Sequence, residues 1–112
     1  MNFSIVIPLY NENENVNQLN EELSNSLSKL QNKNHEFEII YVDDGSTDNT
    51  LESLKALKNE IKTIILKNNK NLAQSKSIMN GMEESSYNNI VLLDGDLQND
   101  PKDIIKMVDV YS

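Results

Sequence analysis

The chain has 112 residues, a formal net charge of −8 at pH 7 and no cysteine. Its length suits one domain, its acidic charge argues against a protein that coats nucleic acid with a basic face, and the absence of cysteine excludes disulfides and thiolate metal sites. The N-terminus lacks a basic region followed by an apolar stretch, so no signal peptide is predicted, and the longest apolar runs are far shorter than a membrane span.

The first two predicted elements are a buried strand over residues 3–9 and a helix after it. The strand is a short apolar run. The helix is predicted from one stripe of apolar residues at steps of three and four: Val16, Leu19, Leu23, Leu27 and Leu30. His35, between this helix and the next strand, is predicted to lie on the surface, and we assign it no role.

The second predicted strand covers residues 37–42, which are rich in β-branched and aromatic side chains. It ends in a turn sequence, Asp43-Asp44-Gly45-Ser46. Asp48 or Thr47 is expected to cap the following helix. A third strand is predicted over residues 61–66.

The third predicted helix covers residues 73–84, with Ile78, Met79 and Met82 expected to face the core. A fourth strand over residues 90–93 leads into Asp94-Gly95-Asp96, and Pro101 stands at a favourable first position for a last helix. The chain stops just after this eighth element. We therefore expect residues 1–112 to be the N-terminal part of a truncated domain.

The alternation of strands and helices predicts an α/β fold, with a Rossmann-like parallel sheet of about four strands and helices on both faces. With a strand order of roughly 3-2-1-4, the first, second and fourth strands are neighbours. Ligands in such folds bind beyond the carboxyl ends of the strands. The unusual polar residues of this chain follow those ends, so we expect one crevice there.

Asp94 and Asp96 flank a glycine on a turning segment, where two carboxylates can reach one hard cation such as Mg²⁺ or Mn²⁺. Gln98 adds a neutral oxygen. The alternative is an acidic turn that caps the last helix. The position after a wholly apolar strand favours the metal site.

The other candidate residues can be interpreted without a binding role. Asp43 and Asp44 either make a turn or accept hydrogen bonds from a base or ribose, as acidic residues after a strand do in dinucleotide folds. Tyr10 either lies against a base or fills a loop. Lys70, taken alone, is most simply a solvated charge.

Four segments, in this order and spacing, resemble the family 2 glycosyltransferases, which use one nucleotide-binding α/β domain called GT-A. The segments are residues 5–12 (IVIPLYNE), 41–48 (YVDDGSTD), 70–75 (KNLAQS) leading to Gly81, and 94–101 (DGDLQNDP). The Asp-Leu-Gln ending of the motif in the last segment resembles the polyprenyl- and dolichyl-phosphate hexosyltransferase branch in particular. The resemblance covers nearly the whole chain.

The resemblance implies roles for three groups of residues. The nucleoside would be held by Pro8, Tyr10, Glu12 and Asp44, with support from Asp43. The phosphates or the sugar would lie near Lys70 and Gln74. A cation on the donor diphosphate, Mg²⁺ or Mn²⁺, would be held by Asp94, Asp96 and Gln98, with Asp94 also contacting the donor and Asp96 as the catalytic residue. Two positions depart from the branch: Lys70 stands where arginine is usual, and Ala73 stands where glycine is usual.

The implied reaction transfers a hexose with inversion from a UDP- or GDP-sugar to an acceptor, expected to be a polyprenyl phosphate at the cytoplasmic face of a membrane. One alternative is a truncated module that binds nucleotide sugar without transfer. Another is a phosphoacceptor receiver domain, which the segments Pro8-Leu9-Tyr10 and Leu66-Lys67-Asn68 disfavour because they lack its acidic residues. The outer edge of residues 90–93 is expected to promote self-association.

Overall fold

The computed structural model describes residues 2–31 and 35–93. Along this part of the chain the elements are β1 (Asn2–Leu9), α1 (Val16–Gln31), β2 (Glu36–Asp43), α2 (Thr50–Lys55), β3 (Lys62–Lys67), α3 (Gln74–Glu84) and β4 (Asn89–Leu92). The expected last helix lies outside the described residues. Within the described part, no helix combines the length and apolar character needed to cross a membrane.

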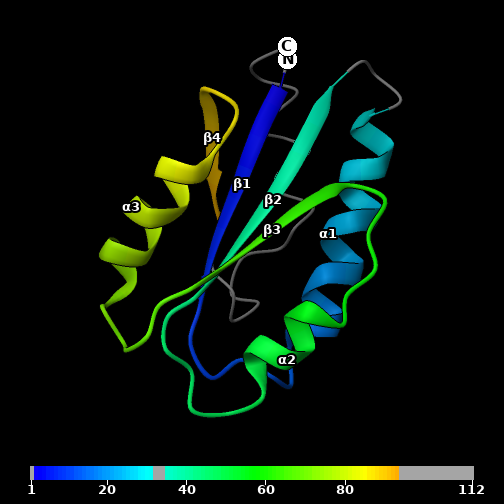
Figure 1. Ribbon diagram of the computed structural model, residues 1–112. Helices are drawn as coiled ribbons and strands as arrows, with labels where there is room; N and C mark the ends of the chain where they lie inside the picture. The colour runs from blue at the N-terminus through cyan, green and yellow to red at the C-terminus, as the bar shows by residue number, and fades with distance from the viewer. Residues whose placement is uncertain (1, 32–34, 94–112) are drawn as a thin grey trace.

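The four strands form one parallel sheet in the order β3-β2-β1-β4. Helices α1 and α2 cover one face of this sheet and α3 covers the other (Figure 1). The predicted fold class, the strand order and the placement of helices on both faces are therefore confirmed. All four carboxyl ends point to the lower edge of the sheet in Figure 1.

The core has two layers because successive strand side chains point to opposite faces. Ile5 and Ile7 belong to the larger layer, which includes the apolar stripe of α1. Val6 belongs to the smaller layer on the α3 face, together with Ile40 and Val42. The whole predicted α1 stripe is buried, so that prediction is confirmed.

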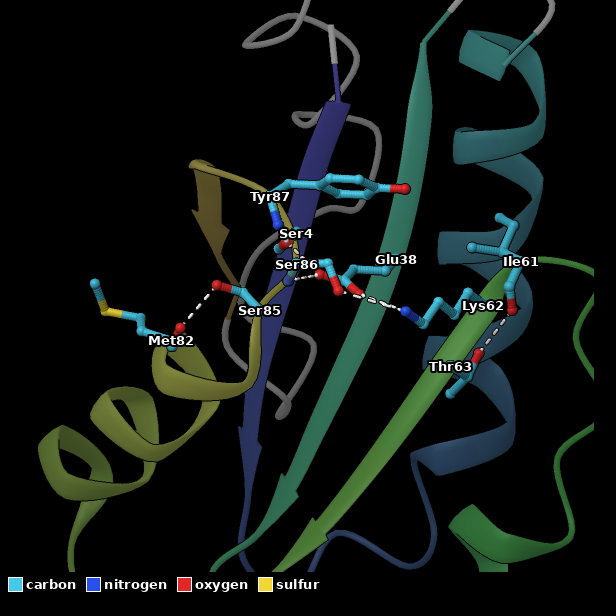
Figure 2. A network of polar contacts seen from close by, with 9 residues as sticks. All are labelled: Ser4, Glu38, Ile61, Lys62, Thr63, Met82, Ser85, Ser86 and Tyr87. Atoms are coloured by element: carbon cyan, nitrogen blue, oxygen red, sulfur yellow. Dashed lines mark hydrogen bonds and ion pairs between the residues drawn. The ribbon is translucent and has the colours of Figure 1, made fainter.

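The prediction for the inward face of α3 is wrong for Met79 and Met82, whereas Ile78 is half-buried. Met79 is 53% exposed and Met82 is 44% exposed, and Figure 2 shows the Met82 side chain pointing away from the sheet. The buried positions are Ser77 and Gly81. A Cβ atom on Gly81 would lie 2.5 Å from Cγ1 of Val6, so the helix approaches the sheet too closely for a large side chain at this contact.

The surface prediction for His35 is also wrong. His35 is 7% exposed, and its ring centroid lies 5.9 Å from that of Phe3 and 6.4 Å from that of Phe37. Phe3 and Phe37 are register partners in β1 and β2. The imidazole therefore packs on an aromatic pair at the amino end of the sheet.

Candidate functional site

The loops that follow β1 and β2 are joined by reciprocal hydrogen bonds. The backbone N–H of Asn11 donates to Oγ of Ser46 at 2.9 Å, and the backbone N–H of Thr47 donates to Oδ1 of Asn11 at 2.8 Å. Asn11 has a φ of 53°, a left-handed conformation that asparagine tolerates better than most residues. The two loops thus form one wall at the carboxyl edge of the sheet.

Asp48 fixes the outer part of this wall. Its carboxylate accepts hydrogen bonds from the backbone N–H of Thr50 at 2.9 Å and from the backbone N–H of Asn13 at 3.3 Å. Burial raises the pKa of Asp48, but the hydrogen bonds from Thr50 and Asn13 outweigh it and lower the pKa below its ordinary value. Asn49, rather than Asp48 or Thr47, occupies the N-cap position of α2, without a side-chain cap bond. The expected cap is therefore corrected by one residue.

Asp43 and Asp44 are both buried, at 2% and 4% exposure. Oδ1 of Asp43 accepts a hydrogen bond from the backbone N–H of Ser46 at 3.3 Å, which closes the turn after β2. The backbone N–H of Asp44 donates to the carbonyl of Leu9 at 2.8 Å. Its carboxylate Oδ1 accepts the backbone N–H of Leu72 at 2.8 Å. Asp44 therefore ties β1, β2 and the β3–α3 loop together.

The β3–α3 loop sits directly on the turn at Gly45. Gly45 has a φ of +72°, and a Cβ atom there would lie 2.4 Å from the carbonyl carbon of Lys70 and 2.6 Å from the backbone nitrogen of Asn71. The side chain of Lys70 is exposed. Ala73 closes the loop with a φ of 80° and a ψ of 157°, and Gln74 follows as the first residue of α3. The loops that follow β1, β2 and β3 therefore meet around Asp44 and Gly45.

Six of the predicted binding residues lie in or just after the carboxyl ends of β1, β2 and β3: Pro8, Tyr10, Glu12, Asp43, Asp44 and Lys70. Tyr10 is 42% exposed, and Oε2 of Glu12 accepts a hydrogen bond from Nδ2 of Asn15 at 2.8 Å. Pro8 lies two residues past Val6, where the β1–β4 register ends. Its missing N–H therefore costs that ladder no hydrogen bond.

The predicted metal ligands Asp94, Asp96 and Gln98 lie outside the described residues. The residue before them, Leu93, donates its backbone N–H to the carbonyl of Val6 at 3.1 Å. In residues 2–31 and 35–93, no three His, Cys, Asp or Glu side chains gather closely enough to hold a metal ion.

The sequence analysis missed Asn68, which directly follows β3 and is buried against Asp44. Its Nδ2 donates to Oδ1 of Asp44 at 2.9 Å. The available signal was its position at a strand carboxyl end, the same criterion that singled out Asp43 and Asp44. An amide in an asparagine-rich loop does not stand out by type.

A second polar cluster lies near the opposite end of the sheet and was also missed (Figure 2). Glu38 in β2 is fully buried, and its Oε2 accepts hydrogen bonds from Oγ of Ser4 at 2.6 Å and from the backbone N–H of Ser86 at 2.5 Å. Nζ of Lys62 lies 3.6 Å from Oε1. Burial raises the pKa of Glu38, but these hydrogen bonds and Lys62 outweigh it, so the pKa lies below its ordinary value. The cluster joins β1, β2, β3 and the α3–β4 connection.

Comparisons with known proteins agree with the geometry. A family model described as "Glycosyl transferase family 2" matches residues 4–112. The chain is 43% identical over 109 residues to the undecaprenyl-phosphate 4-deoxy-4-formamido-L-arabinose transferase of Yersinia enterocolitica, covering 96% of this chain and 32% of that protein. It is 33% identical over 109 residues to the dolichol-phosphate mannosyltransferase of Pyrococcus furiosus, covering 97% of this chain and 30% of that protein. The chain therefore spans about a third of the length of these relatives.

Solved structures show the same fold. The crystal structure of S. aureus TarS 1-349 superposes with a TM-score of 0.73 at 26% identity, over 99% of this chain and 32% of that one. The same protein in complex with UDP-GlcNAc superposes with a TM-score of 0.76 at 23% identity, over 99% of this chain and 31% of that one. The four-stranded sheet thus corresponds to part of a larger solved fold.

Proposed function

This chain belongs to glycosyltransferase family 2, and we propose that its carboxyl-edge loops bind the donor of a sugar transfer from a nucleoside-diphosphate sugar to a polyprenyl phosphate. The observation that carries the proposal is the buried pair Asp43 and Asp44, held between the loops that follow β1 and β3. Buried carboxylates at the carboxyl edge of a parallel sheet are suited to accept hydrogen bonds from a nucleoside. The solved complex of TarS with UDP-GlcNAc supports a donor of this class.

The proposed nucleoside site combines two carboxylates, Asp43 and Asp44, with the aromatic ring of Tyr10. Asp44, with Asp43 beside it, accepts hydrogen bonds from the base or ribose. Tyr10, which is 42% exposed, offers an aromatic face on which a base can stack. Pro8 lies in β1 two residues before Tyr10, and Glu12 lies in the following loop two residues after it.

The proposed diphosphate site lies toward β4. Asp94, Asp96 and Gln98 would supply oxygen ligands of the kind that Mg²⁺ and Mn²⁺ prefer, and a cation held by them would neutralise charge on the leaving nucleoside diphosphate. Lys70 adds a positive charge on the β3–α3 loop, and Gln74 begins the helix that follows it. In this proposal Asp96 is the catalytic residue and Asp94 also contacts the donor.

The proposed acceptor is a lipid phosphate, because two relatives are named for undecaprenyl phosphate and dolichol phosphate. Its position at the cytoplasmic face of a membrane is part of the proposal. In the proposed reaction an acceptor phosphate oxygen attacks the anomeric carbon while the bond from that carbon to the nucleoside diphosphate breaks. A single displacement of this kind inverts the anomeric configuration. Because the acceptor oxygen is already ionised near neutral pH, this chemistry needs no general base to activate it.

Calorimetric titration of UDP- and GDP-sugars with Mn²⁺, with Mg²⁺ or with EDTA tests the proposal. We expect binding that depends on the cation, and we expect Asp96→Ala to remove most of the metal-dependent affinity because the cation loses a charged ligand. Equal binding in all three conditions would contradict the metal role. Binding without transfer to a polyprenyl phosphate would favour a module that only holds the donor.

A further inference from the structure

Asn68, the residue after β3, makes four hydrogen bonds. It is 8% exposed. Its backbone N–H donates to the carbonyl of Asp43 at 2.9 Å. Its Nδ2 donates both to Oδ1 of Asp44 at 2.9 Å and to Oγ of Ser77 at 2.9 Å. Its Oδ1 accepts Nδ2 of Asn80 at 3.1 Å.

These contacts determine which way the amide faces. An ionised carboxylate can only accept hydrogen bonds, so the nitrogen of the Asn68 amide must face Asp44. The amide oxygen then faces the donor Nδ2 of Asn80. Both ends of the amide are satisfied in this orientation alone, and the backbone hydrogen bond to Asp43 fixes where the side chain begins.

We propose that Asn68 is a positioning residue that orients the Asp44 carboxylate for the nucleoside of the donor, an inference that rests on the proposed function. The Asn68 amide and the backbone N–H of Leu72 both converge on Oδ1 of Asp44, at 2.9 and 2.8 Å. Two donors on one oxygen fix the plane of the carboxylate and direct Oδ2 to the ligand. Through Ser77 and Asn80 the same amide couples this orientation to α3.

The test is Asn68→Leu, which keeps nearly the same side-chain volume and removes the amide. Calorimetry measures the affinity for the nucleoside diphosphate, UDP or GDP, that the unaltered protein binds, and for inorganic pyrophosphate with Mn²⁺. We expect a loss of about tenfold for the nucleotide, equivalent to about 1.4 kcal/mol, and no change for pyrophosphate, which has no nucleoside for Asp44 to contact. In an Asp44→Ala background, Asn68→Leu should cause no further loss.

Asn59→Leu is the matched control. Asn59 is a second asparagine in a polar network, this one partly buried and remote from the carboxyl-edge loops. Its Nδ2 donates to Oδ1 of Asn20 at 2.9 Å and to Oγ1 of Thr63 at 3.0 Å. It should lower thermal stability and leave nucleotide affinity unchanged. If Asn68→Leu does not fold, Asn80→Ala replaces it, because it removes the donor to the Asn68 amide oxygen, and a smaller loss of the same pattern is expected.

Three results would overturn the inference while the proposed function stands: unchanged nucleotide affinity in Asn68→Leu, an equal loss for pyrophosphate, or a loss that adds to that of Asp44→Ala. An equal loss in Asn59→Leu would do the same, because it would indicate general loosening. Failure of the unaltered protein to bind either nucleotide would instead refute the proposed function, and the inference with it.

Discussion

Gly45 and the backbone of Lys70 are in contact so close that no side chain fits between them. A Cβ atom on Gly45 would lie 2.4 Å from the carbonyl carbon of Lys70, and Gly45 has a φ of +72°. We predict that Gly45→Ala lowers the free energy of unfolding by at least about 2 kcal/mol, from backbone strain and overpacking together. It should also weaken nucleotide binding, since Asp44 precedes it. Urea unfolding and calorimetry measure the two effects.

Gly81 differs from Gly45 in the kind of atom that an added Cβ would meet. A Cβ on Gly81 would meet Cγ1 of Val6 at 2.5 Å, so the obstacle is a side chain. Val6→Ala should therefore relieve part of the cost of Gly81→Ala. Lys70→Ala should relieve none of the cost of Gly45→Ala, because the atoms in contact there are backbone. Recovery of stability in the Gly45→Ala, Lys70→Ala pair would contradict our account.

Ala73 occupies a backbone conformation that favours glycine. Its φ of 80° and ψ of 157° fall in a region that is essentially restricted to glycine and costs other residues about 1–3 kcal/mol. We predict that Ala73→Gly raises the free energy of unfolding by about 1 kcal/mol, because relief of strain is partly offset by the greater entropy of the unfolded chain. Urea unfolding measures the change.

The chain offers a matched control in its other alanine. Ala56, at the end of α2, has a φ of −83° and a ψ of −9°, which is ordinary for alanine. Ala56→Gly should lower stability or leave it unchanged. If both substitutions lower stability by the same amount, Ala73 is not strained.

Local patterns in the sequence were sufficient to predict the α/β order, the buried stripe of α1 and the carboxyl-edge position of Asp43 and Asp44. The inward face of α3 was not predictable in this way. Met79 and Met82 are the larger apolar side chains, but the distance between helix and sheet selects Ser77 and Gly81 for the contact. That distance is set by tertiary packing and has no local signature.

The partners of the site residues were equally hidden from the sequence. Asn68 and Asp44 are 24 positions apart, and their contact depends on the pairing of β2 with β3. Glu38 looked like one polar residue in an apolar strand. Its role in joining four segments of the chain depends on Ser4, Lys62 and Ser86, which lie far from it in sequence.

Glu38 should make stability depend on pH in the acid range. Its pKa is lowered in the folded protein, so the unfolded chain binds its proton more readily. The stabilisation is therefore complete above the unfolded pKa of about 4.3 and is lost as pH falls through the lower folded pKa.

Urea unfolding at several pH values between 7 and 3 should show a shallower decline in the free energy of unfolding for Glu38→Gln than for the unaltered protein. Asp48→Asn is a separate comparison, because the pKa of Asp48 is also lowered and Asp48 therefore contributes to the same decline in stability. Parallel declines in Glu38→Gln and the unaltered protein would exclude Glu38 as a source.

The outer edge of β4 is predicted to promote self-association. Among the described strands, β4 pairs with β1 only, and its Leu92 is 49% exposed. An unpaired strand edge beside apolar side chains is a template for a second chain, although the net charge of −8 opposes association.

Sedimentation velocity over a wide concentration range should show a concentration-dependent increase in mass. Leu92→Lys should suppress it, because a charge at the edge disfavours strand pairing, whereas Met79→Lys, on the outward face of α3, should not. A monomer at every concentration would contradict the prediction, and equal suppression by both lysines would move the contact from the edge of β4 to a broader apolar surface.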